Sequence, residues 1–198
     1  YPLRRQRQMC IRDSTWTTRT SNFGLVNIVS VAYGSGIWVA GGASGQVRTS
    51  TNNGVTWNTS GSVGTGLNSV SYGGGIWVAA LGTGVQTSFK DEPLRTSTDN
   101  GVTWNTRVST FTTGINTIAY GDGTWVAGGV MGTGSASRTT LSNWVTAESN
   151  SSSRSFLSVA YGNGMFMAGM DSGGQIRVSS NGISVSYTHL TLPTKRIV

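Results

Sequence analysis

The chain repeats one sequence unit four times, and this repetition limits the folds that it can adopt. The segments VAYGSGIWVAGG, VSYGGGIWVAAL, IAYGDGTWVAGG and VAYGNGMFMAGM place equivalent tyrosines at Tyr33, Tyr72, Tyr120 and Tyr161. Successive tyrosines are 39, 48 and 41 residues apart, and the longest interval contains an insertion, QTSFKDEPL. A period of about 40 residues indicates supersecondary units that bury their apolar faces by stacking on one another.

Each unit is predicted to form four short strands. LNSVSYG alternates apolar and polar residues, IWVAA is continuously apolar, QVRTS alternates again and VTWNT ends the unit. Turns such as GGG and DNG separate these segments, and turns of this kind favour antiparallel hairpins. No segment shows the 3.6-residue period of a helix. We therefore expect an all-β fold, a partial β-propeller of four four-stranded antiparallel blades.

A second motif alternates with the first. STDNGVTW at residues 97–104 resembles the Asp-box of sialidase-type BNR repeats, S-x-D-x-G-x-T-W, and STNNGVTW at residues 50–57 matches it with Asn in place of Asp. The matching residues are Ser97, Asp99, Gly101, Thr103 and Trp104, and Ser50, Asn52, Gly54, Thr56 and Trp57. We expect the Asp or Asn side chain to accept backbone N–H groups and the glycine to be left-handed. The resemblance implies that the box is structural and that its tryptophan is buried between neighbouring sheets.

The number of blades leaves two arrangements open. Rings of such blades usually hold about six to eight, so four blades favour an open arc. A closed four-bladed ring is the alternative, because STWTTRT at the start resembles an outer strand over Thr15–Thr20 that could complete the last blade. The repeats are predicted at about 15–57, 58–104, 105–144 and 145–184.

Both ends of the chain read as translated DNA that is foreign to the repeats. Ten codons that encode Val185–Thr194 also encode Arg4–Asp13 when read as their reverse complement. This DNA resembles the inverted end of a transposon-based sequencing adapter, so residues 1–14 and 185–198 are set aside as translated adapter. We expect these ends not to pack consistently against the repeats. We also expect the rest of a longer polypeptide to be missing.

The composition of residues 15–184 excludes several functions. These residues hold eight Lys or Arg and six Asp or Glu, so most of the formal charge of +7 lies in the adapter segments. A balance this close to neutral is no signature of nucleic-acid binding, and no membrane span is apparent. Cys10 and His189, the only cysteine and histidine, also lie in the adapter segments. We therefore expect no metal site and no cofactor.

Candidate binding residues fall into two groups. Arginines recur in the third predicted strand as VRTS, LRTS, SRTT and IRVS, at Arg48, Arg95, Arg138 and Arg177. They fit either structural residues that cover a neighbouring blade or a basic rim for an acidic glycan or a partner carboxylate. The insertion supplies Phe89, Lys90, Asp91 and Glu92 beside Arg95. Insertions into repeats often form the binding face, although a longer solvated hairpin fits equally well.

Catalysis by the chain itself is not indicated. A glycosidase needs two carboxylates that face each other across one bond, whereas Asp91 and Glu92 are adjacent and Glu148 stands alone. We expect a non-catalytic recognition or structural module that binds a glycan or a protein. The YGNG half of the repeat resembles repeats of phage and bacterial surface proteins, which implies a phage tail or bacterial surface protein, extracellular or virion-associated. Two alternatives remain: a fragment of a secreted sialidase-like glycoside hydrolase, and a propeller-type assembly factor.

Overall fold

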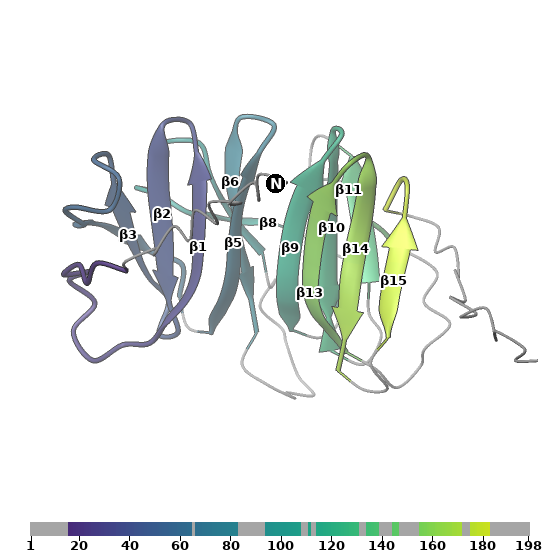
Figure 1. Cartoon of the computed structure of the whole chain (residues 1–198), viewed down its shortest axis with the longest axis horizontal. Coiled ribbons are helices and arrows are strands. Elements are labelled where there is room, and N and C mark those ends of the chain that lie inside the picture. The colour runs from purple at the N-terminus through teal and green to yellow at the C-terminus, as the bar shows by residue number, and fades with distance from the viewer. Residues whose placement is uncertain are drawn as a thin grey trace, which may run out of the picture.

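The computed structural model confirms an all-β fold of four antiparallel sheets in an open arc (Figure 1). It describes residues 16–64, 66–82, 94–107, 111, 114–130, 134–138, 144–146, 155–171 and 175–182. Each sheet is a meander in which consecutive strands pair, so each sheet corresponds to one sequence repeat. We number these sheets as blades 1 to 4.

The strands of the four blades have the following bounds. Blade 1 contains β1 (Ile28–Gly34), β2 (Ile37–Gly42), β3 (Gln46–Ser50) and β4 (Asn58–Ser62). Blade 2 contains β5 (Leu67–Gly73), β6 (Ile76–Leu81), β7 (Leu94–Ser97) and β8 (Asn105–Arg107). Blade 3 contains β9 (Ile115–Gly121), β10 (Thr124–Gly129), β11 (Gly134–Arg138) and β12 (Trp144–Thr146). Blade 4 contains β13 (Phe156–Gly162), β14 (Met165–Met170) and β15 (Ile176–Ser179).

Two features differ from the sequence-based expectation. The fourth strand of blades 1 and 2 follows Trp57 and Trp104, so the repeat boundaries drawn after these residues fall one strand before the ends of the sheets. Residues 16–20 form no strand, although an outer strand was expected over Thr15–Thr20. This segment precedes blade 1. Among the described residues, it pairs with no sheet edge of its own chain.

The first two strands of every blade are joined by a tight two-residue turn. Both turn residues have positive φ, for example 46° at Asp122 and 71° at Gly123. This is the geometry of a type I′ turn, whose twist matches that of the flanking strands. The turn sets the register so that each repeat tyrosine lies opposite an aromatic residue. The pairs are Tyr33–Trp38, Tyr72–Trp77, Tyr120–Trp125 and Tyr161–Phe166, with ring centroids 4.7–5.0 Å apart.

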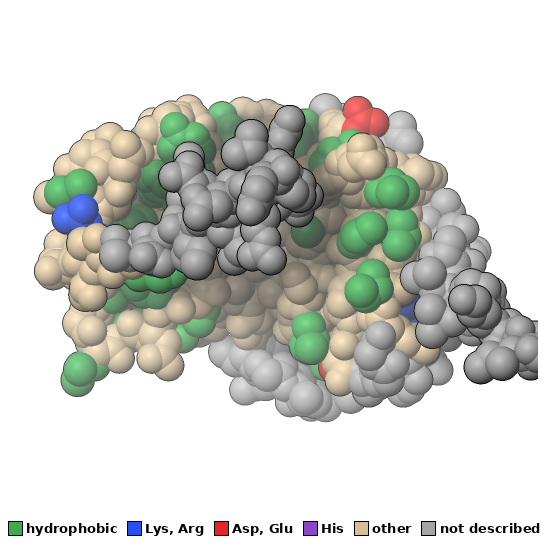
Figure 2. All heavy atoms as spheres, in the orientation of Figure 1, with side chains coloured by type: hydrophobic (Ala, Val, Ile, Leu, Met, Phe, Trp, Pro, Cys, Tyr) green, Lys and Arg blue, Asp and Glu red, His purple; other side chains and the backbone are tan. Residues whose placement is uncertain are grey.

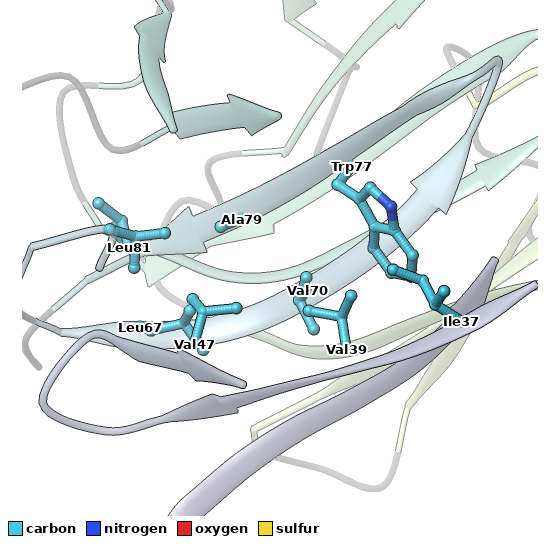
Figure 3. Packing of buried hydrophobic residues seen from close by; sticks show 9 residues of the cluster. Ile37, Val39, Val47, Leu67, Val70, Trp77, Ala79 and Leu81 are labelled. Atoms are coloured by element: carbon cyan, nitrogen blue, oxygen red, sulfur yellow. The ribbon is translucent and has the colours of Figure 1, made fainter. Parts of the chain in front are cut away.

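The hydrophobic core lies between blades. Between blades 1 and 2, Val39 and Val47 pack with Leu67, Val70 and Trp77 (Figure 3). Equivalent clusters lie between blades 2 and 3 and between blades 3 and 4. A single blade therefore cannot bury its apolar face, and each blade depends on its neighbour for a core.

In blades 1 to 3, the glycine at the end of the first strand contacts the tyrosine of the next blade. A Cβ atom on Gly34, Gly73 or Gly121 would overlap the ring of Tyr72, Tyr120 or Tyr161, respectively. None of these three glycines has a positive φ, so close approach of the ring is the reason for glycine here. We call these positions glycine pits.

Hydroxyl groups tie each first strand to the first strand of the next blade. Ser30 Oγ accepts the Val70 N–H at 2.9 Å, and Thr117 Oγ1 accepts the Val159 N–H at 3.0 Å. The Ile118 N–H donates in the same way to Ser69 Oγ at 3.4 Å. These hydrogen bonds satisfy amides on the unpaired edge of each first strand.

The asparagines of two first strands add a further link between blades. Asn68 Nδ2 donates to the carbonyl of Ile115, and Asn116 Nδ2 donates to the carbonyl of Phe156, both at 2.9 Å. The strand register shifts at each of these asparagines, and such an irregularity can re-aim a side chain out of its own sheet.

The arc is open because the two terminal blades lie at opposite ends of the row (Figure 1). Val31 of blade 1 is 51% exposed, whereas the equivalent Val70, Ile118 and Val159 are 4%, 4% and 8% exposed. Trp77 and Trp125 are buried, whereas the equivalent Trp38 is half-buried. The first blade thus presents to solvent the face that blades 2 to 4 bury.

The glycine pits make a direct stability prediction. Gly121→Ala should destabilise the fold by about 1–3 kcal/mol, because the new methyl group overlaps the Tyr161 ring. Gly162→Ala at the equivalent position of blade 4 should leave the free energy of unfolding of the monomer unchanged, since a Cβ there meets nothing within 4 Å. Urea denaturation of both variants measures the difference, and equal effects would contradict this packing.

Candidate functional site

The turn at residues 97–104 is built around Ser97 and Asp99. Ser97 Oγ donates to Asp99 Oδ1 at 2.7 Å and accepts the Gly101 N–H at 2.9 Å. Asp99 Oδ1 also accepts the Thr103 N–H at 2.9 Å, and its Oδ2 accepts from Thr103 Oγ1 at 2.6 Å. Asp99 therefore closes the turn as expected, and the hydroxyl group of the buried Ser97, an Asp-box residue for which no role was predicted, is a second centre of hydrogen bonding.

The turn at residues 50–57 has the same geometry with asparagine. Ser50 Oγ donates to Asn52 Oδ1 at 3.0 Å, and the Thr56 N–H donates to the same Oδ1 at 2.9 Å. Asn52 Nδ2 then donates to Thr56 Oγ1 at 2.9 Å, the reverse of the hydroxyl bond in the other turn. A threonine hydroxyl both donates and accepts, so Asp and Asn can alternate at this position. The expected left-handed glycines have φ values of 77° at Gly54 and 81° at Gly101.

The tryptophans of these turns are less buried than expected. Trp57 and Trp104 are both half-buried, and their indole N–H groups donate to the carbonyls of Gly54 and Gly101 at 3.1 and 2.9 Å. This bond holds each ring along its own turn, so neither indole is inserted fully between sheets. Trp104 still packs against the cluster between blades 1 and 2. The tryptophan therefore stabilises a turn at the blade interface.

Three of the four candidate arginines share one register. Arg48, Arg95 and Arg177 lie opposite Ala40, Ala79 and Ala168 of the second strand of their blades. Arg138 breaks the series, because it pairs with Thr124, while Ser135 occupies the equivalent position opposite Ala127. Arg138 is thus three residues further along its strand, roughly 10 Å away. Ala127 and Ser135 are eight residues apart, as are Ala40 and Arg48 of blade 1, so the additional residues of this repeat come after Ser135.

The three in-register arginines are partly integrated into the scaffold. The Arg48 guanidinium lies 5.4 Å from the centroid of the Phe23 ring, which is a cation–π contact. Arg95 Nη1 donates to the Leu94 carbonyl at 3.1 Å, and Arg177 is only 6% exposed. These positions favour the structural interpretation, with Arg48 and Arg95 remaining half-exposed.

The same three arginines mark one edge of the arc. Each of them lies within the first three residues of its strand, which is β3, β7 or β15. At this edge β6 ends at Leu81 and β7 begins at Leu94. The insertion connects β6 to β7, so its flanking strand ends lie at this edge, opposite the hairpin turns. Phe89, Lys90, Asp91 and Glu92 themselves lie outside the described residues.

Asp99 is unsuited to proton donation. Its hydrogen bonds from the Thr103 side chain, the Thr103 backbone and the Ser97 hydroxyl lower its pKa from 3.8 to about 2. A general acid needs a pKa raised toward the working pH, and Asp99 is shifted in the opposite direction. Within the described residues, no group of three or more His, Cys, Asp or Glu side chains could hold a metal ion. The described part of the chain also contains no helix that is long and apolar enough to cross a membrane.

Solved structures with a similar fold are β-propeller proteins. The designed Ika4 protein is 11% identical, with a TM-score of 0.64, and the match covers 84% of this chain and 99% of that one. An ancestral GH74 enzyme is 19% identical, with a TM-score of 0.62, over 81% of this chain and 24% of the enzyme. YCF48 bound to D1 peptide is 14% identical, with a TM-score of 0.59, over 86% of this chain and 55% of that protein.

These likenesses show the fold alone, because the sequence identities are low. The chain spans less than two thirds of the length of the GH74 enzyme and of YCF48. No protein-family model matches the sequence, and no curated protein matches it.

The turn chemistry predicts a pH effect on stability. Because folding lowers the pKa of Asp99 from 3.8 to about 2, its ionised form stabilises the fold above pH 4, and this contribution is lost as the pH falls from about 4 to 2. The Asp99→Asn variant should retain the turn, because Asn52 forms the same turn. As the pH falls from about 4 to 2, its melting temperature should fall less steeply than that of the wild type. Thermal melts from pH 5 to pH 2 measure the two slopes.

Asp122→Asn removes one carboxylate from an exposed hairpin turn and serves as the matched control. The control should follow the wild-type slope more closely than Asp99→Asn does. Identical slopes for the wild type and Asp99→Asn would show that Asp99 is not stabilised by its turn.

Proposed function

We propose that the chain is a non-catalytic β-propeller recognition module of the BNR or Asp-box type, from a phage tail or bacterial surface protein. Its ligand is a protein segment or a glycan that docks at the edge carrying Arg48, Arg95 and the strand ends of the insertion. The observation that carries this proposal is the shared register of the arginines at that edge. Arg48 and Arg95 are half-exposed, and guanidinium groups bind carboxylates and acidic sugars bidentately.

The use of the repeated residues supports a binding role for the loop. The tyrosines, the Ser-Asx turns and the first-strand hydroxyl groups all make contacts within or between blades. Residues committed to the scaffold are poor candidates for ligand contacts. The insertion departs from the repeat, and non-repeated loops on a rigid scaffold commonly carry function.

Two neighbouring structures bear on the class of ligand. YCF48 is described as bound to the D1 peptide, and nidogen matches in its complex with laminin at 8% identity and a TM-score of 0.63. Both favour a protein ligand and also agree with the alternative role of an assembly factor. The GH74 likeness favours the other alternative, a fragment of a secreted sialidase-like glycoside hydrolase whose catalytic carboxylates lie outside this chain.

Deletion of residues 86–93 tests the binding edge. The deletion restores the shorter connection of blade 1, so the fold should be retained while binding to the ligand falls at least about tenfold. Arrays of sialylated and sulfated glycans and of acidic peptides serve as probes, with the affinity for each hit measured by biolayer interferometry. Asn163→Gly, in a hairpin turn at the opposite edge, is the control and should bind as the wild type does.

An unchanged affinity of the deletion variant would remove the insertion from the proposal. Loss of binding in the Asn163→Gly control as well would place the contact elsewhere. Hydrolysis of a sialylated probe by the chain would favour the hydrolase alternative.

A further inference from the structure

The outer face of blade 4 is exposed at positions that are buried in blades 1 and 2. Met167 is 48% exposed, whereas the equivalent Val39 and Val78 are 0% exposed. Ile176 is 71% exposed, whereas the equivalent Val47 and Leu94 are 0% exposed. Figure 2 shows apolar side chains at the surface over β14 and β15, at this end of the arc.

One empty glycine pit and one open glycine of the second strand give this face a specific shape. Gly162 is equivalent to Gly34, Gly73 and Gly121, each of which receives a tyrosine ring, but a Cβ at Gly162 meets nothing within 4 Å. Gly169 is likewise open, whereas Gly41 and Gly128 are covered by the side chains of Leu67 and Phe156. The exposed Ser158 takes the place of the hydroxyl groups that accept an amide from the next blade. Blade 4 therefore carries the same contact positions with which blades 1 to 3 receive a following blade.

The complementary surface lies on blade 1 of the same sequence. Tyr33 is 57% exposed and is equivalent to the tyrosines that fill the pits. Ile28 is 44% exposed, whereas the equivalent Leu67, Ile115 and Phe156 are 1%, 0% and 7% exposed. With Val31, these side chains match the apolar residues that blades 2 to 4 each insert against the preceding blade.

The segment before blade 1 has the pattern of a missing outer strand. TWTTR at residues 15–19 matches TWNTR at residues 103–107, which leads into β8. Trp16 precedes Tyr33 by 17 residues, the same spacing as Trp144 and Tyr161, so the segment lies in phase as the outer strand of a preceding blade. Trp16 is 97% exposed, and blade 4 has three strands among the described residues.

We propose that the chain associates head to tail with a second copy of itself. Blade 1 of one copy seats on the outer face of blade 4 of the other, with Tyr33 in the Gly162 pit and Val31 N–H bonded to Ser158. Residues 16–20 of the incoming copy add a strand to blade 4. The interface repeats the contacts already present three times within the chain, whereas blades 1 and 4 of one chain lie at opposite ends (Figure 1). Such a heterologous contact closes a ring of two copies or, without closure, extends into longer chains.

Complementation between two variants of the full chain tests this interface. Val31→Asp should disable the blade 1 end, and Gly162→Ala should disable the blade 4 end, because the methyl group blocks the pit. Each variant alone should be monomeric in multi-angle light scattering and native mass spectrometry, while the wild type forms dimers or longer oligomers. A mixture of the two variants should form a one-to-one heterodimer, because each contributes its intact end.

Two further variants separate the interface from general effects. Val102→Asp introduces the same charge at a site that is 55% exposed, and this variant should associate as the wild type does. Thr18→Pro should weaken association at least about tenfold without changing the melting temperature of the monomer, because proline removes an N–H from the added strand. A wild type that stays monomeric at all concentrations, or a mixture of Val31→Asp and Gly162→Ala that does not associate, would overturn the proposal.

Discussion

The fold depends on the contact between the first strands of neighbouring blades. At each of the three interfaces, a tyrosine ring covers a glycine, and a serine or threonine hydroxyl accepts an amide of the next blade. The apolar clusters lie on these same interfaces, so the core exists only where blades are stacked. The chain is therefore a one-dimensional array, in which each terminal blade lacks one of the two neighbours that an inner blade has.

This dependence on stacking distinguishes the residues that stabilise the fold from the residues that are candidates for ligand binding. At the three interfaces, the recurring residues are occupied in stacking or in closing the Ser-Asx turns, and the lowered pKa of Asp99 is a result of that role. Recognition is then left to features outside the repeat. The insertion between β6 and β7 is such a feature, and the half-exposed Arg95 directly follows Leu94, the strand end on its C-terminal side.

The hairpins and the stacking of the repeats could be predicted, because they depend on short sequence patterns. The alternation in LNSVSYG and the glycine turns indicated the hairpins, and the repeat phase indicated stacking. The depth of Trp104 could not be predicted, because it depends on a hydrogen bond to the Gly101 carbonyl. The position of Arg138 was missed because spacing alone does not show where a repeat absorbs extra residues. The segment at residues 16–20 has a strand-like sequence, but a strand also needs a paired edge, which sequence does not supply.

The most direct test is hydrogen–deuterium exchange, resolved to single amides, in dilute protein. The amides of Val70, Ile118 and Val159 donate to a hydroxyl of the preceding blade, whereas among the described residues no preceding blade reaches the equivalent Val31. The stacked arrangement predicts strong protection of the first three amides and fast exchange at Val31. Similar exchange rates at all four positions would contradict it.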